Sequence, residues 1–172
     1  GQCSVESGGT LTGNTSYSLT LAGSDQDNNF NNSGTITNLN LIMTGIRASG
    51  DRSIIDSGSG IRDLTINDTT NSGNNVHKLG NNLSISGNLT ITSGTFSTVT
   101  PAGSSVSLTV TGHVSVDGTL TGNASAISAG SMIINSGGTY SATTGTTTIN
   151  SENASHAFRC SGGGTFTNND GT

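Results

Sequence analysis

A short signature recurs along the chain: a run of alternating residues leads to a glycine, a threonine and one large apolar residue. In the second half of the chain, the threonines of this signature are separated by 24, 20 and 26 residues. A unit of this size cannot bury an apolar face alone, so it must stack on its neighbours. The repeat therefore predicts a solenoid. The apolar residues of the six signatures are predicted to form its core ladder: Leu11, Ile36, Phe96, Leu120, Tyr140 and Phe166.

The residues between the signatures alternate with the period of a β-strand. Leu83, Ile85, Leu89 and Ile91 are separated by serines, threonines and a Gly-Asn pair, and no segment shows a helical period. We expect an all-β fold, a parallel β-helix (β-solenoid) of about seven irregular coils of 20–26 residues with essentially no α-helix. An antiparallel β-sandwich is an alternative, but its strands have no reason to share a signature. A disordered Ser/Thr/Asn/Gly tract is the other alternative, and the ordered β-branched residues disfavour it.

The 172 residues are predicted to form a single β-solenoid domain. Residues 1–81 should form less regular coils with longer loops, because 60 residues separate Thr35 from Thr95 without a signature. Residues 82–172 should form the regular coils. The chain starts at Gly1 without a methionine and stops where another strand should begin, so we expect it to be an excised segment of a longer repetitive chain.

The charge of the chain restricts its partners. The formal net charge is −5, only 9% of the residues are charged, and there are five Lys and Arg residues. This charge argues against binding to nucleic acid, which needs a basic surface. No apolar run approaches the length of a membrane-spanning helix, so we expect no membrane insertion. A surface rich in Thr, Ser and Asn with little Lys suits an extracellular or virion-surface location.

The regular half also carries a family resemblance. The string SVDGTLTGNASAISAGSMIINSGGTYSATTGTTTINSE, with NLTITSGTFSTVT before it and GGTFTNNDGT after it, resembles Thr/Gly-rich repetitive segments of marine bacteriophage tail-fibre and virion structural proteins. Similar repeats occur in bacterial surface adhesins. The resemblance covers residues 82–172 and implies a structural role in a virion or outside the cell. It implies no catalytic residues.

The two cysteines precede similar signatures, Cys3 in QCSVESGGTL and Cys160 in RCSGGGTF. We expect them at equivalent corners of the first and last coils, which in a straight solenoid is too far apart for an internal disulfide. One interpretation is two free, buried thiols. The other is an intermolecular disulfide that joins Cys160 of one copy to Cys3 of the next in an end-stacked fibre.

Candidate sites for a metal or for catalysis are weak. Asp25, Asp27 and Asn29 are spaced like the start of a calcium loop, but Phe30 and Ile36 replace the glycine and the acid of an EF-hand. A looser Ca²⁺ site or a solvated surface loop remains, and no other cofactor is predicted. The densest charged group is predicted to be surface charge rather than a catalytic group for polysaccharide cleavage. The histidines show no metal spacing and should be solvated or at strand edges. These charged residues and histidines are Arg47, Asp51, Arg52, Asp56, Arg62, Asp63, His77, His113 and His156.

The sequence therefore predicts a non-enzymatic structural or adhesive module of a phage appendage or extracellular fibre. Its partners would be other copies of itself, other virion or surface proteins, or a cell-surface glycan that contacts residues 47–78. The alternatives are a filament subunit that stacks end to end, an ice-binding solenoid with stacked Thr-x-Thr runs, and a carbohydrate-binding or carbohydrate-active β-helix. Thr-x-Thr runs also have a simpler explanation, because threonine is a favourable exposed strand residue.

Overall fold

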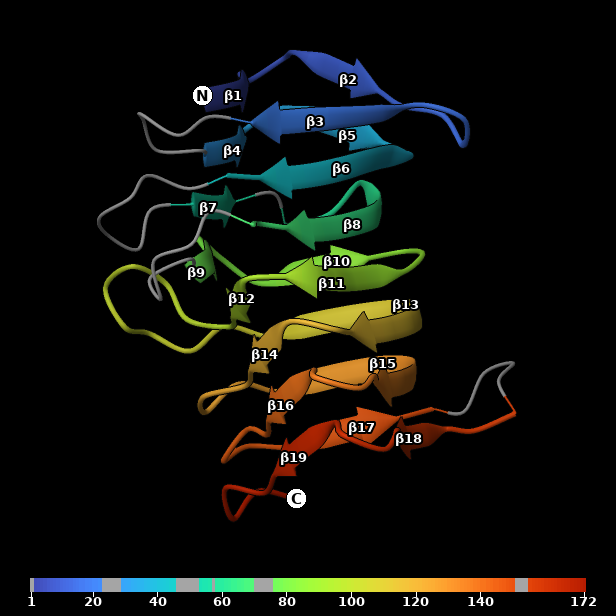
Figure 1. Cartoon of the computed structure of the whole chain (residues 1–172). Coiled ribbons are helices and arrows are strands. Elements are labelled where there is room, and N and C mark those ends of the chain that lie inside the picture. Colours follow the sequence, from blue (N-terminus) through green and yellow to red (C-terminus); the bar gives the residue numbers. More distant parts are fainter. Residues whose placement is uncertain (1, 23–28, 46–52, 57, 70–75, 151–154) are drawn as a thin grey trace.

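The chain forms a stack of β-strand coils. The computed structural model describes residues 2–22, 29–45, 53–56, 58–69, 76–150 and 155–172. Within them the chain folds into 19 strands and no helix, and no helix long and apolar enough to cross a membrane is found there. Figure 1 shows the coils stacked along one axis, with the N-terminus at one end and the C-terminus at the other. The prediction of an all-β parallel solenoid is confirmed, with about six turns.

Two long parallel sheets form the two main faces. The eight-stranded sheet contains β1 (Gln2–Val5), β4 (Asn29–Asn32), β7 (Ser53–Asp56), β9 (Val76–Leu79), β12 (Thr95–Ser97), β14 (Thr119–Thr121), β16 (Thr139–Ser141) and β19 (Thr165–Thr167). The nine-stranded sheet contains β3 (Ser18–Ala22), β6 (Leu39–Thr44), β8 (Ile61–Asn67), β10 (Leu83–Ile85), β11 (Leu89–Ser93), β13 (Leu108–Val116), β15 (Ile127–Ile134), β17 (Thr147–Ile149) and β18 (Phe158–Cys160). In the first two coils, β2 (Thr10–Thr12) and β5 (Thr35–Thr37) add a two-stranded sheet between these faces.

Alternation within seven strands of the nine-stranded sheet produces two inward ladders of seven residues each. At each level, the residues of one ladder lie two positions from those of the other, so both point to the same side of the sheet. The first ladder, hereafter the Leu89 ladder, consists of Leu19, Leu41, Leu64, Leu89, Val114, Met132 and Phe158. The second, hereafter the Ile91 ladder, consists of Leu21, Met43, Ile66, Ile91, Val116, Ile134 and Cys160.

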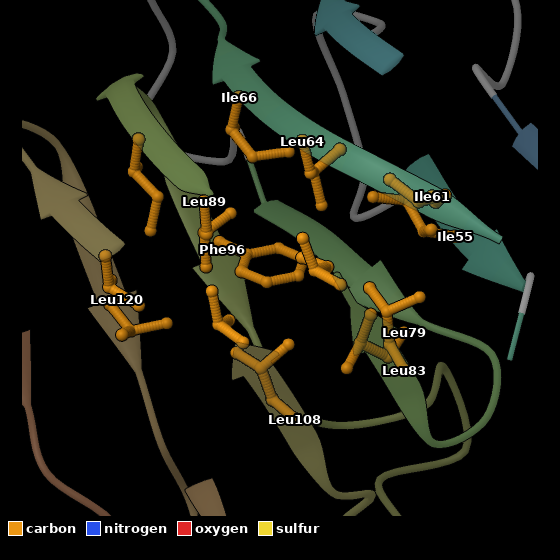
Figure 2. Close-up of a cluster of buried hydrophobic side chains, with 14 of the residues drawn as sticks. Ile55, Ile61, Leu64, Ile66, Leu79, Leu83, Leu89, Phe96, Leu108 and Leu120 are labelled. Atoms are coloured by element: carbon orange, nitrogen blue, oxygen red, sulfur yellow. The ribbon is translucent and has the colours of Figure 1, made fainter. Parts of the chain in front are cut away.

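These ladders pack against apolar residues of the opposite sheet. Figure 2 shows Leu64 and Leu89 from the nine-stranded sheet directed into the same interior as Phe96 and Leu120. All four side chains are essentially inaccessible to solvent. Removal of this apolar surface from water is the main force that holds one coil on the next.

The six signature residues, predicted to form one core ladder, belong to two ladders instead. Leu11 pairs with Ile36 in the two-stranded sheet. The other four, Phe96, Leu120, Tyr140 and Phe166, are stacked in register in the eight-stranded sheet. The reason is that the signature marks a glycine turn rather than a fixed position in the cross-section. In the first coil this turn follows the eight-stranded sheet, whereas in the last coils it precedes that sheet.

Candidate functional site

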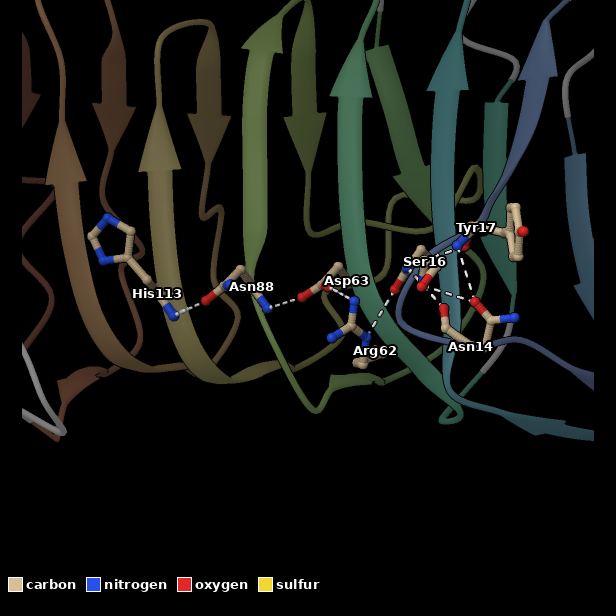
Figure 3. A network of polar contacts seen from close by, with 8 residues as sticks. Asn14, Ser16, Tyr17, Arg62, Asp63, Asn88 and His113 are labelled. Atoms are coloured by element: carbon tan, nitrogen blue, oxygen red, sulfur yellow. Dashed lines mark hydrogen bonds and ion pairs between the residues drawn. The ribbon is translucent and has the colours of Figure 1, made fainter.

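A series of hydrogen-bonded polar side chains crosses the coils at one corner of the solenoid, hereafter the polar spine (Figure 3). It begins with Asn40, whose Nδ2 donates to the carbonyl oxygens of Asn14 and Tyr17, both at 3.1 Å. Asn14 in turn accepts hydrogen bonds at Oδ1 from the backbone N–H groups of Ser16 and Tyr17, at 2.8 and 3.1 Å. Arg62 Nε donates to Asn40 Oδ1 at 2.9 Å. These contacts connect the first three coils.

The spine continues through an ion pair into the regular coils. The Arg62 guanidinium lies 2.6 Å from the Asp63 carboxylate, and each side chain is 29% exposed. Asp63 Oδ1 accepts the backbone N–H of Asn88 at 2.8 Å, and Asn88 Oδ1 accepts the backbone N–H of His113 at 2.8 Å. His113 Nδ1 lies 2.8 Å from Ser131 Oγ. Each carboxylate or amide oxygen thus replaces a backbone acceptor where the strand ladder is interrupted.

Glycines make room for these side chains. A Cβ atom at Gly87 would lie 2.3 Å from Asp63 Oδ1, and one at Gly112 would lie 2.5 Å from Asn88 Oδ1. Both distances are shorter than any real contact, so a side chain at either position would displace the spine. The glycines in the strand patterns therefore have a packing role here.

The electrostatic environment of the spine favours a neutral His113. Burial lowers the pKa of His113 below its ordinary value of 6.5, and the positive charge of Arg159 lowers it further. The spine oxygens of Asp63 and Asn88 are engaged by backbone donors of the next coil. This arrangement joins successive coils.

Of the charged group singled out in the sequence, the structure brings together Arg62 and Asp63. Arg47, Asp51 and Arg52 lie outside the described residues, and the Asp56 side chain is not described. The predicted calcium ligands Asp25 and Asp27 likewise lie outside the described residues, and of Asn29 only the backbone position at the start of β4 is described. Among the described residues, no group of three or more His, Cys, Asp or Glu could hold a metal ion.

The structure places a buried acid–histidine pair in the core. His77 Nε2 lies 3.5 Å from Asp68 Oδ2, and both side chains are 0% exposed. His77 is paired in register with Phe96, so it occupies the position that later coils give to a large apolar residue. The expectation of a solvated or edge position is wrong for His77. Its alternation with Val76 and Lys78 within a strand was the available signal.

The cysteines do not occupy equivalent corners. Cys3 lies in the eight-stranded sheet next to Phe30, and Cys160 lies in the nine-stranded sheet next to Ile134. Both thiols are free; Cys3 is partly buried and Cys160 is exposed. Burial raises the pKa of Cys3. Stacking of copies in register would align like sheets, which keeps Cys160 of one copy and Cys3 of the next in different sheets, so this geometry does not favour the predicted disulfide.

Among the described residues, Thr10 and Thr12 pair with Thr35 and Thr37 in the two-stranded sheet, and a longer threonine column lies in the eight-stranded sheet. Thr95, Thr119, Thr139 and Thr165 are in register along the eight-stranded sheet. The parallel column alternates serine and threonine: Ser97, Thr121, Ser141 and Thr167. The Nδ2 atoms of Asn123 and Asn169 donate to the two serine hydroxyls at 3.0 and 2.9 Å. Because these hydroxyls are already bonded, the surface is not the uniform array that ice binding would need.

A cavity of about 280 Å³ lies near the C-terminal residues, and no pattern in the sequence predicts it. The rings of Tyr140 and Phe166 are 5.7 Å apart, and those of Phe158 and Phe166 are 5.4 Å apart. Phe158 and Phe166 are 39% and 46% exposed. The Tyr140 hydroxyl lies 2.7 Å from Thr147 Oγ1 at the edge of this cavity. Further lining residues are Ala142, Thr143, Asn168, Gly171 and Thr172.

Comparison of the chain with protein-family models, with curated proteins and with solved structures finds no match.

Proposed function

We propose that the chain is a non-enzymatic structural module, a stiff β-solenoid spacer in a phage virion appendage or an extracellular fibre. The observation that carries this proposal is the continuity of the Leu89 and Ile91 ladders. Both run without interruption from β3 in the first coil to β18 in the last. Such a continuous stack transmits force along its axis through backbone hydrogen bonds and a close-packed core.

The polar spine supports the same role. Its hydrogen bonds join residues about one coil apart, such as Asp63 with Asn88 and Asn88 with His113, each separated by 25 residues. Contacts between successive coils oppose bending and local opening at the corner where the strands break. The polar Thr, Ser and Asn surface suits exposure to solvent, and the resemblance of residues 82–172 to phage structural repeats favours a virion or extracellular setting.

Limited proteolysis tests the mechanical part of this proposal. With a protease of broad specificity, we expect early cleavage outside the strands, for example in residues 98–107, and slow cleavage across β13 and β15. Gly112→Val, which displaces the Asn88 contact, should accelerate cleavage between these coils, whereas Thr109→Val on the outer face of β13 should not. Cleavage of β13 and β15 as fast as cleavage of the loop would contradict a stiff spacer.

Incubation with a panel of polysaccharides tests the non-enzymatic part. We expect no release of new reducing ends, because the structure directs no carboxylate pair into a cavity among the described residues. Release that the native chain shows and the Asp63→Asn variant lacks would overturn the proposal.

A further inference from the structure

We draw no further inference here: the strongest candidate, the column of threonine side chains along the outer face of the eight-stranded sheet (Thr95, Thr119, Thr139 and Thr165), is a stripe of small polar residues, and nothing in the structure shows what covers it.

Discussion

Truncation of a central ladder residue tests how the stack is stabilised. Leu89 is 0% exposed and lies in register between Leu64 and Val114. Leu89→Ala should lower the free energy of unfolding by about 4 kcal/mol, in the upper part of the range for buried leucines. The neighbouring levels are held at a spacing of about 4.8 Å by backbone hydrogen bonds, so they cannot collapse into the cavity that the substitution leaves.

Leu19→Ala is the matched control, because Leu19 ends the same ladder and is only partly buried. It has one in-register neighbour, Leu41, and its truncation should cost about 1 kcal/mol. Urea unfolding followed by far-UV circular dichroism measures both variants. At a slope of about 2 kcal/mol/M, Leu89→Ala should lower the midpoint by about 2 M. A loss for Leu89→Ala no larger than that for Leu19→Ala would refute the view that stability accumulates through stacked levels.

Three further predictions concern the titratable and reactive groups. Asp68→Leu should lower the free energy of unfolding by about 3 kcal/mol, because it removes the carboxylate from the buried His77 ring. Adding His77→Phe to this variant should restore most of the lost stability. Equal urea midpoints for the single and double variants would contradict this prediction. Brief treatment with N-ethylmaleimide and mass mapping should modify Cys160 before Cys3, since Cys160 is exposed and burial raises the pKa of Cys3; equal rates would contradict it. Because the pKa of His113 is lowered in the folded chain, the unfolded chain binds the proton of this imidazole more tightly than the folded chain does. The free energy of unfolding should therefore fall as the pH drops from 6.5 through the lowered pKa, and it should level off below that pKa. The His113→Asn variant should lack this part of the pH dependence of the urea midpoint, and an unchanged pH profile would contradict the assignment.

The alternation and the repeat were sufficient to predict the architecture. Leu83, Ile85, Leu89 and Ile91 alternate within one coil, and the same pattern returns one period later with Leu108, Val110, Val114 and Val116. In-register stacking of such units follows because their apolar faces can be buried only against each other. The parallel pairing of β10 and β11 with β13 confirms this expectation residue by residue.

The polar features were not predictable in the same way. The contact of Asp63 with Asn88 joins residues 25 positions apart and depends on the register of two coils with unequal loops. His77 reads as an ordinary polar residue in a short strand, and its alternation gave only a weak signal of the burial that its pairing with Phe96 establishes. The cysteines illustrate the same point, because similar local motifs around Cys3 and Cys160 lie in different sheets.

The sequence by itself determined the class of fold and most of the apolar side chains that enter the core, because these depend on local alternation and on a repeating period. Only the tertiary structure decided which corner each glycine turn occupies and which polar side chains join the coils. These features depend on how many residues each coil places in its loops, because the loop lengths set the register in which each coil pairs with the next.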